Sequence, residues 1–269
     1  MDAHSRCADP LFVDAEARDF RLQPDSPALA LGFRPFDLDA PGLYGDAEWT
    51  SLPEKHPPLP LLATERNKGM LLVDDDFEAI AVGHKPSYAA LVEAPAEGAY
   101  IEVSDDRAKS GDRSLKFVDT AEAPVYYHPH MYYTPNLAGD MRLRLSFDLY
   151  REPGAMLWHE WREVSSYAKG GPCIYITAEG ALELKDHVPT GVTLPDGEWL
   201  HFEITDGLGG YADGLWAMRI TNGAGEVLFE VDDLPCAPEF NRIMWLGFVS
   251  NGMQPAVMYL DNVLMREVE

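Results

Sequence analysis

The chain has 269 residues, and its 45 Asp and Glu against 21 Lys and Arg give a formal net charge of −24 at pH 7. This charge disfavours nucleic acid as a partner, because phosphate binding depends on clusters of Lys and Arg. Hydrophobic residues make up 46% of the sequence, which excludes wholesale disorder. The sequence has no apolar run near the ~20 residues of a membrane span, so no membrane partner is expected.

The first 50 residues contain short apolar bursts between turn-forming residues. The bursts are Leu11-Phe12-Val13 and Asp19-Phe20-Arg21-Leu22, and the turn-forming sequence Pro24-Asp25-Ser26-Pro27 follows them. Residues 51–69 then hold four prolines among polar residues. Because proline at this density is incompatible with a central strand or a helix interior, residues 51–69 are predicted to be a semi-rigid linker.

From residue 70 to residue 269 the pattern is that of β-strands. In Met141–Tyr150, five apolar residues alternate with polar ones, which is the period of a strand with one buried face. Many alternating strands without helices between them predict an all-β fold, an antiparallel two-sheet jelly-roll sandwich. The other predicted strands are Trp199–Ile204, Leu215–Ile220, Glu226–Val231, Ile243–Val249 and Ala256–Met265.

The three cysteines, Cys7, Cys173 and Cys236, match no zinc or redox motif. They are read as buried or idle thiols, with a Cys173–Cys236 disulfide left open as the alternative. The opening sequence MDAHSRCADP has no apolar core and is not read as a signal peptide.

Residues 1–50 resemble the last coil and cap of right-handed parallel β-helix proteins of the pectate-lyase-like class. The resemblance rests on Asp9-Pro10-Leu11-Phe12-Val13-Asp14 and on the strand and proline turn that follow it. It implies a β-helix remnant, an upstream β-helix domain as a partner, and a link to polysaccharides. The stacked coils of such proteins are not stable singly, and the catalytic coils would lie upstream, so no catalytic residue is assigned from this resemblance.

Residues 70–269 resemble jelly-roll carbohydrate-binding modules and related concanavalin-like domains. The matching passages are Asp74-Asp75-Asp76-Phe77-Glu78, Ser110-Gly111-Asp112-Arg113-Ser114-Leu115-Lys116-Phe117 and Tyr259-Leu260-Asp261-Asn262-Val263. In that family these segments meet at a structural calcium ion, an ion that prefers six to eight oxygen ligands. The resemblance therefore implies a calcium site at Asp76, Glu78, Ser110 and Asp261. The alternative is that Asp74–Asp76 is only the solvated acidic start of a strand.

Two segments that are polar and aromatic at once are the candidate ligand site. Spacing by two along a strand places His130 and Tyr132 on one face, and Trp158, Glu160 and Arg162 on one face of another strand. Aromatic platforms combined with polar groups suit a sugar. These five residues are therefore predicted to form a carbohydrate contact on one concave surface.

Each of these residues also has a structural interpretation. Trp158 and Trp161 could belong to the core, Glu160 and Arg162 could simply form an ion pair, and His159 could be a satisfied buried histidine. Residues His128 and His130 flank Pro129 and could mark the end of a loop.

The function expected from these observations is a carbohydrate-binding or accessory module that binds a neutral polysaccharide or oligosaccharide and is secreted or held at a bacterial cell surface. The alternative is a catalytic jelly-roll polysaccharide lyase or glycoside hydrolase. The Glu-x-Asp-x-x-Glu pattern of concanavalin-like hydrolases is absent, because Glu160 is followed by Arg162 and Glu163. A Tyr-x-Lys run near the C-terminus, expected of a lyase, is also absent. No catalytic residue is assigned.

Overall fold

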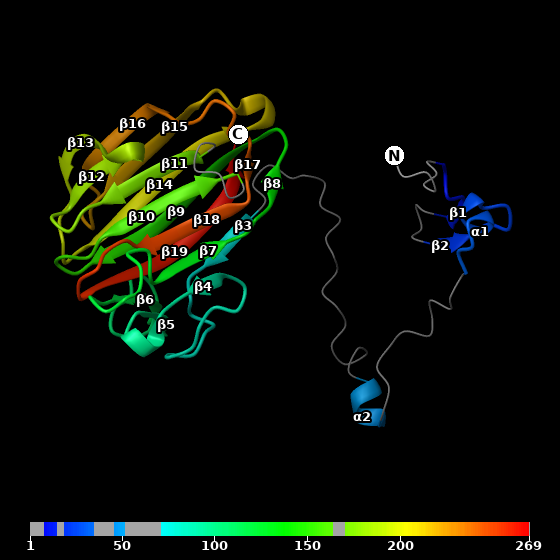
Figure 1. Ribbon diagram of the computed structural model, residues 1–269, viewed down its shortest axis with the longest axis horizontal. Coiled ribbons are helices and arrows are strands. Elements are labelled where there is room, and N and C mark those ends of the chain that lie inside the picture. The colour runs from blue at the N-terminus through cyan, green and yellow to red at the C-terminus, as the bar shows by residue number, and fades with distance from the viewer. Residues whose placement is uncertain (1–7, 15–18, 35–45, 52–70, 164–169, 269) are drawn as a thin grey trace. The chain divides into compact units, whose positions relative to one another are not determined.

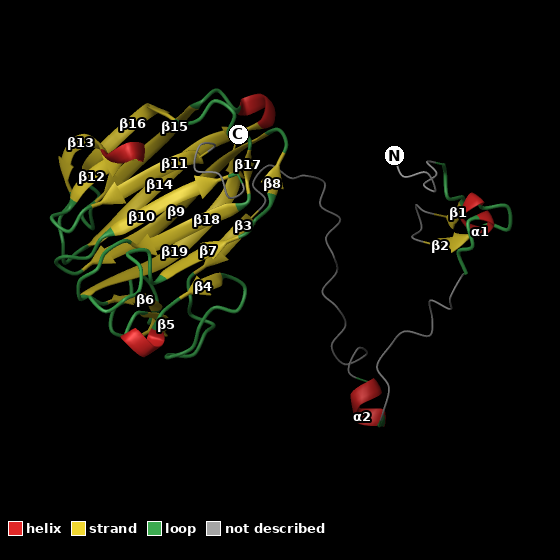
Figure 2. Cartoon of the chain, viewed as in Figure 1, coloured by secondary structure: helices red, strands yellow, loops and turns green. Residues whose placement is uncertain are grey.

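The computed structural model describes residues 8–14, 19–34, 46–51, 71–163 and 170–268. The chain divides into two compact units, Met1–Thr64 and Glu65–Glu269. The described residues are nearly all strand and loop, with only short helical turns (Figure 2). No described helix has the length and apolar character needed to cross a membrane.

The first unit contains strands β1 (Phe12–Asp14) and β2 (Asp19–Leu22), which pair antiparallel, and the short helices α1 (Pro27–Ala30) and α2 (Ala47–Thr50). Ser26 caps α1, since its side chain accepts a hydrogen bond from the amide of Ala28 and donates one to the carbonyl of Pro10. The described residues of this unit do not show a parallel β-helix coil. Apart from Ser51, the predicted linker at 51–69 lies outside the described residues.

The second unit is a sandwich of two antiparallel sheets that lie face to face (Figure 1). The seven-stranded sheet has the order β13 (Val188–Thr193), β12 (Ala181–Leu184), β11 (Gly170–Ile176), β10 (Leu157–Arg162), β18 (Trp245–Ser250), β7 (His130–Tyr133) and β4 (Ala90–Val92). The eight-stranded sheet has the order β16 (Val227–Pro235), β15 (Leu215–Thr221), β14 (Trp199–Leu208), β9 (Met141–Arg151), β19 (Ala256–Val268), β6 (Ser114–Asp119) and β5 (Tyr100–Ser104), with β3 (Leu71–Asp75) paired to β19.

Short elements complete this unit. Strand β17 (Arg242–Ile243) pairs with β8 (Leu137–Ala138), and single 3₁₀ turns η1 (Pro95–Glu97), η3 (Lys185–His187) and η4 (Gly209–Tyr211) lie in connecting loops. In each main sheet, one of the last two long strands lies between strands that come much earlier in the chain. Strand β18 separates β10 from β7, and β19 separates β9 from β6.

The all-β fold class predicted from the sequence is confirmed. The alternation of Met141–Tyr150 corresponds to β9, whose residues Leu143, Leu145, Phe147 and Leu149 are all buried. The predicted strand Ile243–Val249 is instead divided at Met244 between β17 and β18. The remaining predicted strands are present. Each continues past its predicted last residue, and β16 begins at Val227, one residue later than predicted.

The core lies between the two sheets and is built on aromatic contacts. The rings of Phe147 and Phe202 stack with centroids 4.7 Å apart, and Phe248 of the opposite sheet meets Phe147 edge to face at 5.0 Å. Trp161 is fully buried in the same cluster. Each such side chain contributes roughly 1.5–3 kcal/mol by leaving water, so the facing side chains hold the two sheets together.

Candidate functional site

The strand β10 presents two different faces, as its alternating sequence predicts. Leu157 and Trp161 belong to the main core between the sheets. Trp158 instead forms a separate cluster with Cys173 of β11 and Val249 of β18. Because alternate side chains of a strand point to opposite faces, Trp158, Glu160 and Arg162 lie on the face of the seven-stranded sheet that is turned away from the core.

On this outer face, ring and guanidinium groups form a continuous line across four neighbouring strands and η3. His130 stacks on Tyr132 (centroids 6.0 Å apart), and Tyr132 stacks on Trp245 (5.6 Å). The Arg162 guanidinium carbon lies 3.9 Å from the centre of the Trp245 ring and 4.8 Å from that of Trp158.

Beyond Trp158 the line continues to a 3₁₀ turn. Trp158 stacks on Tyr175 at 5.5 Å, and Tyr175 meets His187 at 4.3 Å. We call this line the stacked row; its members are His130, Tyr132, Trp245, Arg162, Trp158, Tyr175 and His187. Since neighbouring strands lie ~4.8 Å apart, the part from β7 to β11 spans roughly 14 Å.

Gly247 allows the row to cross β18. A Cβ atom at this position would lie 1.8 Å from an atom of the Trp245 ring, so the indole lies directly over the backbone of the glycine. The carbonyl of the same residue binds Nδ1 of His159 at 2.8 Å on the core side. The small residue therefore lets Trp245 lie along the sheet between Tyr132 and Arg162.

The charges on this face are paired. Glu160 is 2% exposed, and its Oε2 accepts a hydrogen bond from Nε of Arg162 at 2.6 Å. Burial raises the pKa of Glu160, and the neighbouring Arg162 opposes this shift. Burial also lowers the pKa of His130, which favours the neutral form of its ring. The guanidinium in the row is thus already bound to a carboxylate.

The structure brings all five residues predicted for carbohydrate contact onto one face of one sheet. The exposures differ: Trp158 is only 7% exposed, whereas His130 and Tyr132 are partly exposed. The predicted ion pair between Glu160 and Arg162 is present. A cavity of about 400 Å³, lined by Cys173 and by Lys185 and Asp186 of η3, adjoins the η3 end of the row.

Sequence reasoning missed Trp245 and Tyr175 as members of the row. Trp245 lies in a segment whose other residues are almost all buried, and Tyr175 is in Gly170–Ile176, a strand with no clean alternation. The only signal was aromatic character, which does not show which face a side chain takes. His187 also belongs to the row, and its Nδ1 lies 2.7 Å from Oε2 of Glu183.

His159, Trp199 and His201 do not join the row. His159 is fully buried, and its Nε2 accepts a hydrogen bond from the Trp161 indole at 3.1 Å. Burial lowers its pKa to about 3, so this is the satisfied core histidine considered as an alternative. Trp199 and His201 belong to β14 and lie on the outer face of the other sheet, where Trp199 contacts Tyr150 and His201 contacts Asp148.

The four predicted calcium ligands lie around one loop. Asp261 accepts hydrogen bonds from the amides of Lys109 (2.8 Å) and Ser110 (3.2 Å), and burial raises its pKa to about 6. Glu78 accepts from the next part of this loop, the amides of residues 112 and 113, and Asp76 accepts from the amide of Glu78. Oxygen donors of the type calcium prefers are present here. Among the described residues, however, no three Asp, Glu, His or Cys side chains are grouped as metal ligands.

Cys173 and Cys236 are both free thiols, so the alternative of a disulfide between them is not formed. Cys173 lies beside Glu160 across the β10–β11 pair. Burial raises the pKa of each thiol to about 12, which keeps both protonated and unreactive.

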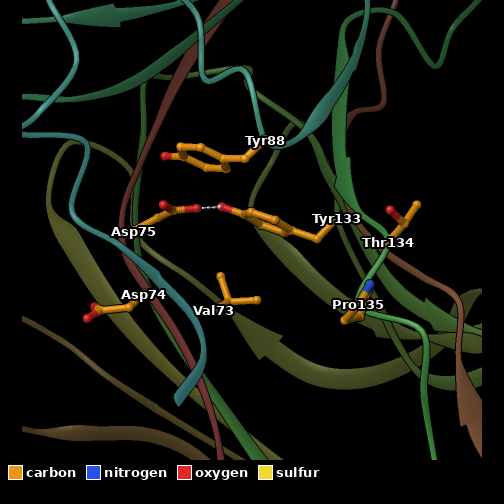
Figure 3. Close-up of a pocket in the computed structure, with 7 residues that line it drawn as sticks. All are labelled: Val73, Asp74, Asp75, Tyr88, Tyr133, Thr134 and Pro135. Atoms are coloured by element: carbon orange, nitrogen blue, oxygen red, sulfur yellow. Dashed lines mark hydrogen bonds between the residues drawn. The ribbon is translucent and has the colours of Figure 1, made fainter. Parts of the chain in front are cut away.

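A cavity of about 290 Å³ lies between the end of β7 and β3 (Figure 3). The Tyr133 hydroxyl donates to Asp75 at 2.5 Å, and Tyr88 lies on the other side of this carboxylate. Burial raises the pKa of Asp75, and hydrogen bonds from both tyrosines oppose the shift. Because Tyr133 and Asp75 come from different sheets, this contact ties the two sheets together at their edge.

No family model matches the sequence, and no curated protein matches it. Solved structures do match. "Cellulose induced protein, Cip1" is 16% identical, with 72% of this chain and 96% of that chain covered and a TM-score of 0.51. An endo-β-1,4-glucuronan lyase from the fungus Trichoderma reesei is 10% identical, with 69% and 93% covered and a TM-score of 0.50. A sialidase is 15% identical over 72% of this chain and only 18% of its own, with a TM-score of 0.51. Likeness at these identities shows the jelly-roll fold.

Proposed function

We propose that the outer face of the seven-stranded sheet binds a neutral polysaccharide, so that the chain acts as a carbohydrate-binding or accessory module. The observation that carries this proposal is the stacked row. Sugar rings pack their apolar C–H faces on aromatic rings, and a line of such rings suits an extended chain better than a single small molecule.

The electrostatics of the row favour an uncharged glycan. Arg162 is bound to Glu160, and burial lowers the pKa of His130, so neither of these two groups acts as a free cation that would attract a uronate. The net charge of −24 also opposes the approach of polyanions. Trp245 and Tyr132 supply ring surface, and the partly exposed Tyr127 lies next to His130 at the β7 end.

Two of the structural neighbours support a role connected with polysaccharides. One is named for its induction by cellulose, and the other is a lyase of a β-1,4-linked polymer. Their jelly-roll sandwiches match this one over most of their own length. We further propose that the chain works outside the cell or at the cell surface, with an upstream β-helix domain as its partner. Cell fractionation and co-purification test these two points.

The test is a binding titration with a panel of neutral and uronate-containing polysaccharides, made with the wild type and three alanine variants. Tyr132→Ala and Trp245→Ala should each lower the affinity for the preferred neutral glycan at least tenfold, as loss of a central aromatic contact commonly does. Trp199→Ala, a partly buried aromatic on the opposite sheet, is the matched control and should bind like the wild type. Equal binding by all three variants would place the glycan elsewhere.

Catalysis by a polysaccharide lyase is the second candidate, and one observation favours it. The row ends in Tyr175 and His187, whose rings are 4.3 Å apart, close to Arg162 in the same line. Tyrosine and histidine are groups that move protons. A hydrolase is less favoured, because it needs two carboxylates facing one bond and Glu160 is held by Arg162. Incubation with polyuronates and detection of unsaturated products by ultraviolet absorbance separates a lyase from a binding module.

A further inference from the structure

The cavity of about 400 Å³ beside η3 lies next to one end of the stacked row. Asp186, which lines the cavity, directly precedes His187, the end member of the row. Cys173 connects the two more closely, because it packs against Trp158 of the row and also lines the cavity. A glycan chain that lies along the row therefore reaches the cavity at its η3 end.

The cavity has an apolar floor and a charged rim, since its lining residues divide by their exposure. The buried or partly buried apolar ones are Cys173, Leu184, Trp216, Cys236 and Ala237. The exposed ones are Asp186, Val188, Pro235, Pro238 and Glu239. The volume lies within the ~300–1,000 Å³ of small-molecule sites. A ligand with an apolar part for the floor and a polar part for the rim fits this arrangement.

Hydrogen bonds hold the wall that follows β16 in place. The amide of Cys236 donates to the carbonyl of the residue before β15 at 2.9 Å, and the amide of Ala237 donates to the carbonyl of Gly170 in β11 at 3.2 Å. The Trp216 indole donates to the carbonyl of Pro235 at 3.2 Å. This wall is therefore formed without a ligand, which lowers the entropic cost of binding one.

The 3₁₀ turn η3 forms the facing wall and has an uncommon backbone. Asp186 and His187 both have φ values of 59°, in the left-handed region that residues other than glycine rarely adopt. The contacts of His187 with Glu183 and Tyr175 hold the turn against the sheet. Such conformations persist where the surroundings enforce them, and they are concentrated at functional sites. Here the turn joins the row to the cavity.

The polar groups of the cavity suit a carbonyl oxygen and its neighbouring donors. Burial raises the pKa of the Cys173 and Cys236 thiols to about 12, so both remain S–H donors. The charge of Lys185 opposes this rise at both thiols, so its ammonium lies near both. Thiols and an ammonium can donate to a carbonyl oxygen, whereas the carboxylates of Asp186 and Glu239 can accept from an N–H or a hydroxyl.

We propose that this cavity binds an acetylated sugar residue of the glycan on the stacked row, an inference that rests on the function proposed for that row. The acetyl methyl group is apolar and suits the floor. Its carbonyl is an acceptor, and an acetamido N–H or a nearby hydroxyl is a donor to the rim. The group is uncharged, which agrees with a chain of net charge −24. Because N-acetyl and O-acetyl groups share this chemistry, the substrate class is an acetylated neutral polysaccharide.

The experiment is a calorimetric titration of the full chain with pairs of glycans that differ in acetylation. One pair is the N-acetylglucosamine hexamer of chitin and cellohexaose, whose rings differ at a single substituent. The other pairs are O-acetylated xylan and O-acetylated glucomannan, each with its alkali-deacetylated form. In at least one pair the acetylated member should bind at least tenfold more tightly than its partner. The pair that shows this difference tells N-acetyl from O-acetyl recognition.

Two variants that place a large side chain on an exposed edge strand test the position of the site. Val188→Trp should cover the mouth of the cavity, and it should fold because Val188 is 53% exposed on the edge strand β13. It should abolish the advantage of the acetylated member and leave the affinity of the unacetylated member unchanged. Val227→Trp, on the edge strand β16 of the other sheet, is the matched control and should bind both members like the wild type.

Tyr132→Ala separates this proposal from the function proposed for the row. It should weaken both members of a pair by the same factor, because it changes the row and leaves the cavity intact. Equal binding of both members in every pair, or an acetyl advantage that persists in Val188→Trp, would overturn the proposal. If Tyr132→Ala still weakened glycan binding in that case, the function proposed for the row would stand alone. Failure of every glycan to bind would overturn both.

Discussion

The guanidinium of Arg162 lies over the Trp245 ring, 3.9 Å from its centre, while its Nε donates to Glu160 at 2.6 Å. One side chain thus connects a nearly buried carboxylate on β10 to an aromatic ring on β18. Glu160 is 2% exposed, so it depends on this partner for its charge. Arg162 therefore supports both the buried charge of Glu160 and the position of the Trp245 ring in the stacked row.

Arg162→Met should destabilise the fold by about 3–5 kcal/mol, because it leaves a buried carboxylate without its partner. The double variant Glu160→Gln/Arg162→Met should recover most of that loss, since it removes the unpaired charge as well. Urea denaturation of the wild type, both single variants and the double variant measures this coupling. A double variant no more stable than Arg162→Met would show that Glu160 does not need Arg162.

Trp158→Ala should reduce both stability and glycan affinity. Trp158 is 7% exposed and packs on Tyr175, so truncation should cost about 3–5 kcal/mol, as for other buried tryptophans. Glycan binding should fall at least tenfold in the fraction that stays folded. Trp158→Phe keeps a ring in the row and should lose less of both. Thermal unfolding measures the stability, and glycan titration measures the affinity. An alanine variant that binds glycan as tightly as the wild type would show that Trp158 does not contact the glycan.

Gly247→Ala should displace the Trp245 indole, because the added Cβ would overlap its ring. The strain should cost about 1–3 kcal/mol, and the near-ultraviolet circular dichroism of the tryptophans should change. Gly223→Ala adds a Cβ that meets nothing closer than 3.9 Å and is the matched control. If the two variants were equally stable and had the same spectrum, the indole would not lie over Gly247 in solution.

Asp206→Asn should stabilise the protein at pH 8. The pKa of Asp206 rises from 3.8 to about 7 on folding, so the folded state binds more protons than the unfolded state between these values. The stability that this proton contributes is complete below pH 4 and is lost as the pH rises through 7. The variant's advantage, on the order of a few kcal/mol at pH 8, should therefore vanish near pH 4. Urea denaturation of both proteins at pH 4, 6 and 8 measures it, and an advantage that grew towards acid would contradict the assignment.

We propose, from the sequence resemblance, that calcium binds at Asp261, Ser110, Glu78 and Asp76. Calcium at 100 times its dissociation constant would add about 2.7 kcal/mol of stability, so EDTA should lower the melting temperature. Asp261→Asn should abolish the difference between the melting curves with and without calcium, while Asp206→Asn should keep it. Identical melting curves for calcium-saturated and EDTA-treated wild type would show that calcium does not bind at these residues.

Patterns within a strand were predictable from the sequence, whereas the order of strands in a sheet was not. The alternation in Leu157–Arg162 correctly separated Trp158 from Trp161, because side-chain direction follows the local backbone. Which strand lies beside β10 depends on long-range packing, so Trp245 was not associated with Arg162. Asp206 was missed because the predicted strand ended at Ile204, whereas β14 continues to Leu208.

The positions of β18 and β19 in the two sheets have a consequence for how the chain folds during its synthesis. Strands β7 and β10 belong to one sheet only through β18, and β6 and β9 belong to the other only through β19. While a ribosome is still synthesising residues before 245, the two halves of each sheet have unpaired edges facing one another, and such edges are prone to aggregate. The insertion of two late strands closes both gaps, so we expect slow, non-local folding in which the surface carrying Tyr132 and Trp158 becomes continuous only at the final step.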